Sequence, residues 1–377
     1  MIKLTVLLSA LLSTHLFAQP FKTITFDDEP LGIYTTEQMK AAWNSPTWSN
    51  GVDEGRCHIV NDPLSEREKV LRVTYPADGV GPREGGAQWQ MYFDDSYDTV
   101  YVSYMVMISE EFDPVRGGKL PGLAGGTSPT GGDIPDGTDG FSARIMWRDR
   151  STADGNQAAL TQYMYHMEST NTWGEDFFWS YPNPTWSSTR RYLRPATWHT
   201  LKTRVIMNTP GEADGRVTSW LDGDLALDST VMLRSHEGTF GVDLFYFSTF
   251  YGGGDQSWAP SKDEYIFFDN FIFSTEDIIP QSSTSENRSN IQRKENSFRV
   301  VGPNSSVSLH LEKMPVNGNA VLKIFSLNGA LIEKHSVGSN NTSVLSLSNQ
   351  HYRSGLYYAV LYHENGIISA QKLPLVK

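Results

Sequence analysis

The sequence predicts an all-β protein, with a jelly-roll β-sandwich followed by a small immunoglobulin-like β-sandwich. Three observations support this prediction. Short runs of alternating apolar and polar residues recur along the chain, turns rich in glycine, proline and asparagine separate them, and long helical periodicity is absent. Many short strands joined by such turns are typical of two packed sheets.

The N-terminal segment predicts export. Residues 1–18 combine a basic start with an apolar run, and cleavage after Ala18 fits the sequence around it. The run is too short to span a membrane, and no later segment is long and apolar enough to do so. We therefore expect a protein that passes through the periplasm and is secreted or held at the cell surface.

Residues 19–276 contain the strands expected of the larger sandwich. Met39–Trp43 suggests a short helix or turn, and Asp222-Gly223 is a hairpin signal. Val100–Ile108 is apolar on both faces, which predicts a central strand. The expected strands are Phe21–Asp28, Val70–Tyr75, Gly85–Phe93, Val100–Ile108, Phe141–Arg148, Ala159–Met167, Trp198–Met207, Gly215–Leu221, Phe240–Phe250 and Tyr265–Ser274.

The composition changes after Ser274. Residues 281–296 are polar and contain no aromatic side chain, so 277–297 is expected to be a linker. Strands resume in 298–377, with two Asn-Gly turns between them, and predict a second small β-sandwich without a cluster of candidate catalytic residues. These strands are Val307–Leu311, Ala320–Ser326, Leu331–His335, Ser343–Leu347, Leu356–Tyr362 and Ile367–Pro374.

Charge and cysteine content narrow the function classes. The formal net charge of −12 argues against a nucleic-acid partner. It still allows binding of an acidic polymer if basic side chains gather in one cleft. Cys57 is the only cysteine, so no intramolecular disulfide is possible.

A glycine-rich motif at residues 116–123 (RGGKLPGL) places one lysine, Lys119, between glycines and a proline. Such a run disfavours a helix and a regular strand interior. It predicts a tight, ordered loop or strand end that lets the backbone approach a ligand closely.

Three further stretches supply polar side chains to the same cleft. In QYMYH at 162–166, Tyr163 and Tyr165 point to one face of a strand. In FSARIMWR at 141–148, alternation puts three polar side chains on one face. In GGAQWQMYF at 85–93, two glutamines alternate with a tryptophan. These residues are Ser142, Arg144, Arg148, Gln88 and Gln90.

Lysine, tyrosine and arginine together suit β-elimination on a uronic-acid polymer. The reaction removes the C5 proton, protonates the leaving 4-oxygen and neutralises the uronate carboxylate. Tyrosine and lysine both titrate near pKa ~10, and neighbouring arginines favour tyrosinate and lower the lysine pKa. A typical glycosidase instead needs two carboxylates, and the sequence lacks the Glu-x-Asp-x-x-Glu strand of some jelly-roll hydrolases.

Each of these residues also has a structural alternative. Lys119 can equally be an ordinary exposed lysine in a loop. The two tyrosines can be aromatic side chains on the outside of a sheet, and the two arginines can form surface ion pairs with Asp149 or Glu168. The histidines His58, His166 and His199 are read as structural, since their spacing is not that of a metal site. Three aspartates, Asp133, Asp136 and Asp139, leave a structural calcium ion open, although a solvated loop is favoured.

Taken together, GGKLPGL, FSARIMWR and QYMYH resemble polysaccharide lyase family 14, which comprises alginate lyases and related uronan lyases on a jelly-roll fold; the family 20 glucuronan lyases share much of the pattern. The resemblance covers residues 21–274. It implies that Lys119 is the essential lysine, that Ser142 and Arg144 lie in the substrate cleft, and that catalysis requires neither a metal nor an organic cofactor. The catalytic tyrosine pair would be Tyr163 and Tyr165, and we add Arg148, Gln88 and Gln90 as groove-lining residues.

The C-terminal stretches LKIFSLNGALIEK and SGLYYAVLYHENGIISAQKLPLVK resemble a type IX secretion sorting domain. This resemblance implies the secretion machinery as a partner. The alternative is an ordinary β-sandwich that binds carbohydrate or spaces the enzyme from a partner.

We therefore expect a secreted lyase that cleaves an anionic uronan, alginate in the first place, to unsaturated oligosaccharides. Lys119 and Arg144 would hold and neutralise the carboxylate, and a role of Lys119 in moving protons is left open. The two tyrosines would act as base and acid in an order that the sequence does not assign. The alternatives are a lyase for glucuronan or another β-uronate polymer, and a carbohydrate-binding protein without catalysis.

Overall fold

The computed structural model describes residues 20–152, 155–180 and 190–278, and seven strands after residue 297. The predicted signal peptide and nearly all of the predicted linker lie outside the described residues. The seven later strands are β17 (Phe298–Val301), β18 (Val307–Leu311), β19 (Ala320–Ser326), β20 (Leu331–Val337), β21 (Val344–Leu347), β22 (Gly355–His363) and β23 (Gly366–Leu375).

The first large sheet has nine antiparallel strands in the described part of the chain. They are β1 (Lys22–Ile24), β2 (Gly32–Ile33), β3 (Cys57–Asn61), β4 (Lys69–Tyr75), β6 (Thr99–Ile108), β12 (His199–Ile206), β13 (Gly215–Leu221), β14 (Asp224–Val231) and β16 (Glu264–Ser274). Their order is β14-β13-β12-β6-β16-β4-β3-β2, and β1 pairs with β16. The central place of β6 confirms the prediction made from its two apolar faces.

The second large sheet has seven strands among the described residues. They are β5 (Ala87–Tyr97), β7 (Gly117–Gly126), β8 (Gly140–Thr152), β9 (Gly155–Tyr165), β10 (Glu175–Phe178), β11 (Tyr192–Leu193) and β15 (Val242–Tyr251). The order is β10-β9-β8-β7-β15-β5, and β11 pairs with β9. We call this second sheet the cleft sheet, because it carries the candidate site.

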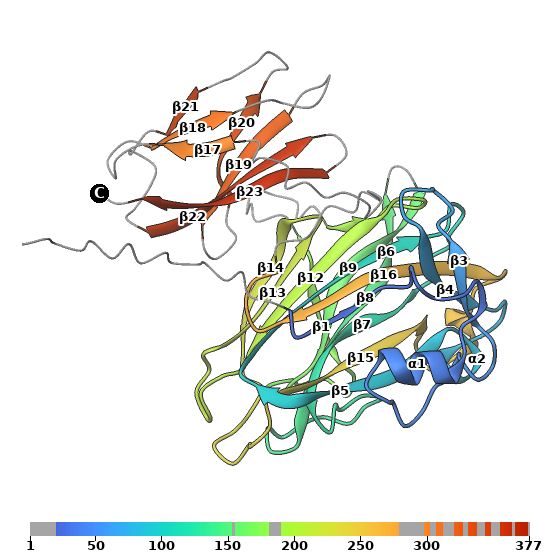
Figure 1. Ribbon diagram of the computed structural model, residues 1–377. Coiled ribbons are helices and arrows are strands. Elements are labelled where there is room, and N and C mark those ends of the chain that lie inside the picture. The colour runs from blue at the N-terminus through green and yellow to red at the C-terminus, as the bar shows by residue number, and fades with distance from the viewer. Residues whose placement is uncertain are drawn as a thin grey trace, which may run out of the picture.

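The two large sheets pack face to face around an aromatic core, as Figure 1 shows. Trp89 of the cleft sheet stacks on Phe247 with ring centroids 3.9 Å apart. Trp43 follows the helix α1 (Thr36–Ala42) and packs edge-on against Trp89 and Phe247. The predicted all-β sandwich is therefore confirmed, with α1, α2 (Gly81–Glu84) and the 3₁₀ turn η1 (Gln256–Trp258) as its described helical elements.

Local signals were reliable where turn or cap chemistry is strong. Asp222 and Gly223 have φ of 53° and 82°, which is the backbone of a tight hairpin between β13 and β14. Thr35 and Gln38 form a reciprocal capping box at the start of α1. The sequence analysis did not identify β2, β3, β10, β11 and β14 as strands, and all of these except β14 have five residues or fewer.

The glycine-rich motif differs from its prediction. Residues 117–126 form the strand β7 in the interior of the cleft sheet, between β8 and β15, and not a loop or strand end. The strand is irregular at its proline: the pairing with β8 shifts register between Leu120 and Leu123. Because proline has no N–H for a ladder, it is tolerated here at the break, where its carbonyl accepts a hydrogen bond from the Tyr104 hydroxyl at 3.0 Å.

The strands after residue 297 form a three-stranded sheet, β17-β18-β21, and a four-stranded sheet, β20-β19-β22-β23. Six of these seven strands match strands predicted from the sequence, and β17 was not predicted. In the described residues, no helix combines the length and the apolar character that crossing a membrane requires.

Candidate active site

One face of the cleft sheet brings the sequence-predicted site residues together. Lys119 of β7 lies directly opposite Met146 of β8, and Arg144 lies opposite Tyr163 of β9. Directly opposed residues point to the same side of a sheet, so these side chains share the outer face, away from the aromatic core. The other predicted residues on this face are Ser142, Arg148, Tyr165, Gln88 and Gln90.

Lys119 is a buried amine without a carboxylate partner in the described residues. Its Nζ donates to Met146 Sδ at 3.0 Å and lies 4.3 Å from the centroid of the Tyr163 ring. A thioether sulfur is a weak acceptor and carries no charge. Burial lowers the pKa of Lys119 well below its ordinary value, and the charges of Arg144 and Arg148 lower it further.

Tyr163 and Tyr165 form a pair of contacting rings beside this amine. Their rings meet edge-on with centroids 5.7 Å apart, and the Tyr165 hydroxyl accepts from the Gly132 N–H at 3.2 Å. Burial raises the pKa of Tyr163, and its neighbour Tyr165 adds to the rise. Tyr163 is therefore held protonated next to an amine whose proton is easily lost.

This result overturns one sequence expectation and confirms another. Arg144 and Arg148 do pull the pKa of Tyr163 down, as expected, but burial outweighs them and the net direction is upward. The expected tyrosinate at Tyr163 is therefore wrong. The expected fall in the lysine pKa is confirmed, because burial and the arginines act on a cation in the same direction.

Arg144 is a buried guanidinium with unused donors. Its Nη1 donates to Ser248 Oγ at 3.3 Å, and its Nε has no hydrogen-bond partner among the described residues. The ring of Tyr246 lies 5.2 Å from its Cζ. Burial lowers the pKa of Arg144, and no carboxylate in the described part of the chain pairs with it. A buried cation in this condition favours binding of an anion from outside.

Arg148 differs from Arg144 because it already has a carboxylate. Its Nη2 lies 2.8 Å from Asp176 Oδ2, and its Nε donates to the same group at 3.0 Å. This partner replaces Asp149 and Glu168, the alternatives considered from sequence. The Cζ of Arg148 still lies 5.6 Å from the Tyr163 ring centroid, so its charge acts on the site.

The three remaining predicted residues have supporting contacts. Ser142 is fully buried and donates to the Pro129 carbonyl at 2.7 Å, so its hydroxyl holds the loop beside the site. Gln88 accepts from Ser248 at 3.4 Å, and the Gln90 side-chain amide donates to Ser128 Oγ at 2.6 Å. Both glutamines are half-buried at the β5 edge of the cleft sheet.

Glycines make this close packing possible. A Cβ at Gly118 would lie 2.1 Å from the Trp147 ring, and one at Gly122 would lie 2.3 Å from the Ala143 carbonyl oxygen. Because Gly122 has no side chain, Arg144 of β8 reaches across β7 to Ser248 of β15. A Cβ at Gly174 would lie 2.8 Å from the Tyr163 ring. The motif glycines therefore serve side-chain packing on a strand.

The site is nearly closed. The exposed fractions are 8% for Lys119, 3% for Arg144, 6% for Tyr163 and 2% for Tyr165. A dry environment strengthens every charge interaction inside it. It also explains why the pKa shifts follow burial more than neighbouring charge.

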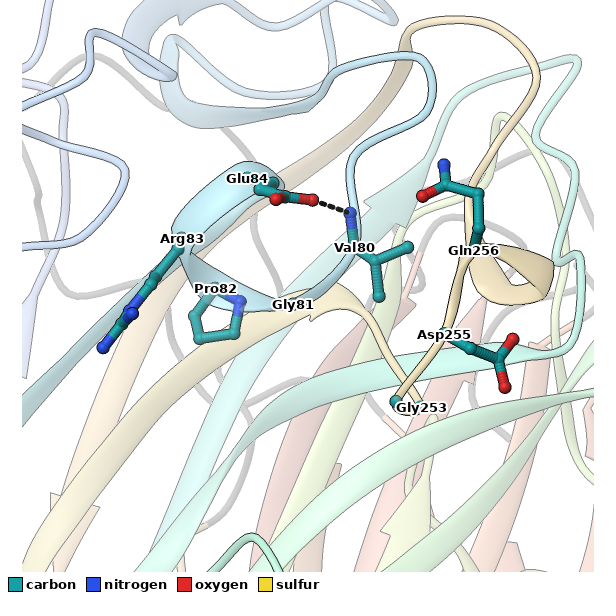
Figure 2. A pocket seen from close by; sticks show the side chains of 9 residues that line it. Val80, Gly81, Pro82, Arg83, Glu84, Gly253, Asp255 and Gln256 are labelled. Carbon is teal, nitrogen blue, oxygen red and sulfur yellow. Dashed lines mark hydrogen bonds between the residues drawn. The ribbon is translucent and has the colours of Figure 1, made fainter.

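A separate surface cavity of about 500 Å³ lies between the α2 loop and the loop after β15. In Figure 2 the Arg83 side chain points away from Gly253 and Asp255, and Glu84 accepts a hydrogen bond from the Val80 N–H. No paired acid–base groups converge on this cavity. We place the site at Lys119 and Tyr163, where the titratable groups with opposed pKa shifts meet.

Within the described residues, no group of three or more histidine, cysteine, aspartate or glutamate side chains is arranged to hold a metal ion. Asp136 accepts from the backbone and hydroxyl of Thr138, which is ordinary loop capping. His166 contacts Glu175 at 3.1 Å and His199 contacts Asp222 at 2.8 Å, which agrees with structural roles.

The sequence analysis missed four residues that line this site. Tyr246 and Ser248 were recoverable, since alternation along the predicted strand 240–250 puts them on one face. Met146 lies between Arg144 and Arg148 in the alternation of 141–148, so its face follows from the sequence, but its contact with Lys119 does not. Asp176 gave no signal, because β10 was not predicted.

Known proteins resemble this chain at the level of a family model and of the overall fold. A family model described as polysaccharide lyase 14 matches residues 64–271. A search of curated proteins returned no significant match.

Solved structures show the same fold. The structure of alginate lyase Aly36B is 24% identical, with a TM-score of 0.57 over 68% of this chain and 98% of that one. An Aly36B variant in complex with an alginate trisaccharide is 23% identical, with a TM-score of 0.58 over 69% and 99%. A marine PL-14 alginate lyase from Aplysia kurodai is 22% identical, with a TM-score of 0.55 over 68% and 100%.

Proposed function

The chain belongs to polysaccharide lyase family 14, and from this premise we propose that it cleaves an anionic uronan by β-elimination, with alginate as its substrate. The observation that carries the proposal is the buried group of Lys119, Arg144 and Tyr163. It combines an amine with a lowered pKa, a guanidinium without a carboxylate partner in the described residues, and a phenol with a raised pKa.

In the proposed mechanism, Arg144 pairs with the uronate carboxylate. Its free Nε and its partly used Nη1 offer donors to a planar carboxylate. Charge pairing stabilises the enolate that forms when the C5 proton leaves. Without such a partner the carboxylate would oppose further negative charge on the same sugar.

Lys119 and Tyr163 divide the proton transfers. The neutral amine of Lys119 takes the C5 proton, because its lowered pKa leaves it deprotonated more readily than a free lysine. The C4–O bond then breaks, and Tyr163 donates its proton to the leaving oxygen, because its raised pKa keeps it protonated. The product carries a C4–C5 double bond, and the tyrosinate recovers a proton from the nearby ammonium. This assignment replaces the tyrosine base expected from the sequence.

Tyr165 is proposed as a positioning residue. Its hydroxyl accepts a hydrogen bond from the Gly132 N–H, and its ring meets the Tyr163 ring edge-on. It thereby orients the phenol that donates the proton. No step requires a metal or an organic cofactor in this scheme.

Export and sorting remain part of the proposal. Residues 1–18 have the pattern of a signal peptide, and the strands after residue 297 carry the motifs that resemble a type IX sorting domain. We propose secretion or surface attachment by that route, with the secretion machinery as the partner. Comparing the protein in culture medium, periplasm and cells, with and without residues 298–377, tests this.

The test of catalysis follows the ultraviolet absorbance of the unsaturated product with alginate, and separately with glucuronan. We expect alginate to be cleaved, and Lys119→Ala and Tyr163→Phe each to lower kcat by roughly 10²-fold or more. Tyr265→Phe, which removes a phenol from β16 of the other sheet, is the matched control and should retain activity.

The outcomes separate the alternatives. Cleavage of glucuronan alone keeps the mechanism and changes the substrate. Full activity in Tyr163→Phe would rule out this phenol as the proton donor. Absence of cleavage with every uronan, in a folded protein, would contradict the proposal.

A further inference from the structure

A second cationic group lies on the same face of the cleft sheet, toward its β10 edge. The ring of Phe178 has the Arg190 guanidinium 3.7 Å from its centroid and the Arg150 guanidinium 4.9 Å from it. Phe178 is half-buried and Arg150 is exposed. The aromatic ring therefore holds two like charges near each other at the surface. We call these three residues the edge patch.

The edge patch lacks a counter-ion among the described residues. Arg150 donates one hydrogen bond, to the Asp149 carbonyl at 3.4 Å, and neither arginine forms an ion pair there. Asp176 of β10 acts on Arg190 as a smaller effect that raises its pKa, but its carboxylate is already bonded to Arg148. Burial lowers the pKa of Arg190, and the charge of Arg150 lowers it further, so the two cations oppose each other. An anion bound between them would relieve this repulsion.

The edge patch is aligned with the catalytic lysine. Phe178 of β10 lies opposite Thr161 of β9, Thr161 opposite Met146 of β8, and Met146 opposite Lys119 of β7. These four positions form one row across the sheet. Neighbouring strands are about 4.8 Å apart, so the row places Phe178 about 14 Å from the Lys119 position. A linear polymer that crosses the strands at Lys119 would reach the patch after a few sugar units.

We propose that Arg150 and Arg190, held by Phe178, form a distal subsite that binds the carboxylate of a uronate unit remote from the cleaved bond. Guanidinium groups suit this role because their planar N–H donors match a carboxylate. The subsite rests on the proposed function, since a polyuronate must cross the sheet to reach it. It would improve binding of long chains without touching the reacting sugar.

The test measures kcat/KM over a length series of alginate oligosaccharides and on the polymer. For Arg150→Gln/Arg190→Gln we expect about a tenfold or larger loss on the polymer, carried by KM, because charge-assisted hydrogen bonds are removed. Oligosaccharides too short to reach from Lys119 to the patch should be cleaved as by the unaltered protein. The step in kcat/KM at the length that reaches the patch should disappear.

Arg216→Gln is the matched control for lost positive charge. Arg216 lies on β13 of the other sheet and pairs with Asp228 at 2.5 Å. The Arg216→Gln variant should leave the dependence of kcat/KM on oligosaccharide length unchanged. The subsite is overturned if Arg216→Gln loses as much kcat/KM on the polymer as Arg150→Gln/Arg190→Gln. It is also overturned if the double variant loses kcat/KM equally at every oligosaccharide length, or loses none on the polymer.

A binding measurement keeps this test separate from that of the catalytic proposal. Electrophoresis through gels that contain alginate reports polymer binding whether or not the polymer is cleaved. Weaker retardation of Arg150→Gln/Arg190→Gln than of Arg216→Gln supports the subsite even if the proton transfers are misassigned. Equal retardation of the two variants, or no retardation of the unaltered protein, overturns it.

Discussion

At the scale of single residues, the site depends on burial of groups that water would otherwise stabilise. Lys119 has a neutral sulfur and an aromatic ring as its close contacts, and Arg144 has a single hydroxyl partner on Nη1. Arg144 therefore favours an anionic ligand, whereas burial makes the proton of Lys119 easily lost. Arg148 follows Arg144 on the same face of β8 and forms an ion pair with Asp176. Its charge lowers the pKa of Lys119.

The pH dependence follows from this arrangement. The charge of Arg148 lowers the pKa of Lys119, so Arg148→Gln should raise it. Loss of Arg148 also frees Asp176, whose charge raises the Lys119 pKa further. If neutral Lys119 is the base, the acidic limb of the pH profile of kcat/KM should move to higher pH in this variant.

The measurement is a profile of kcat/KM against pH for Arg148→Gln and the unaltered protein. Arg216→Gln serves as the control, because its charge lies on the other sheet. A limb that stays in place, or moves to lower pH, would be incompatible with Lys119 as the base.

At the scale of elements, β7 is the strand that positions the site. It crosses the middle of the cleft sheet, carries Lys119 on the outer face, and breaks register at Pro121. Gly118 packs directly against the Trp147 ring, and Gly122 against the backbone of β8. The strand therefore needs small residues where a regular strand would have side chains.

Gly118→Ala tests this requirement. The new Cβ would lie 2.1 Å from the Trp147 ring and 2.5 Å from the Phe250 carbonyl oxygen, so the core or the strand must shift. We expect a loss of about 1–3 kcal/mol in the free energy of unfolding, measured by chemical denaturation. Gly254→Ala, where no atom lies within 4 Å of the added Cβ, should change it by less than about 0.5 kcal/mol. Equal stability of the two variants would show that β7 tolerates side chains.

At the scale of the whole molecule, a buried polar link connects the two large sheets behind the site. Gln162 lies beside Tyr163 but points into the core, where its amide donates to the Ala143 carbonyl at 2.7 Å. Its Oε1 accepts from Ser219 of β13 at 2.9 Å, and Ser219 in turn contacts Thr203 at 3.1 Å. The link joins the strands of the site to the opposite sheet.

Gln162→Leu should remove this link and leave polar groups unsatisfied in the core. We expect a loss of about 1–3 kcal/mol in the free energy of unfolding. Ser219→Ala removes the partner, and the double variant should lose less than the sum of the two single losses, because the link is broken only once. Strictly additive losses would mean that Gln162 and Ser219 act independently.

The sequence by itself determined the fold class, the strands β5, β8, β9 and β15 of the cleft sheet, and which of the predicted polar residues share one face. These follow from local rules: alternation assigns faces, as for Tyr163 and Tyr165, and turn chemistry places the hairpin at Asp222-Gly223. The family motifs then indicated which polar residues belong to one cleft.

The tertiary structure decided what those residues can do. Only the packing across strands shows that Lys119 contacts Met146 and that β7 lies in the interior of its sheet. It also shows that Arg148 forms an ion pair with Asp176, while the Nε of Arg144 has no hydrogen-bond partner among the described residues. The tertiary structure also reversed the expected direction of the pKa shift of Tyr163, since the sequence shows the neighbouring charges of this residue but not its burial. Desolvation depends on every element packed around a group, and no local pattern in the chain records it.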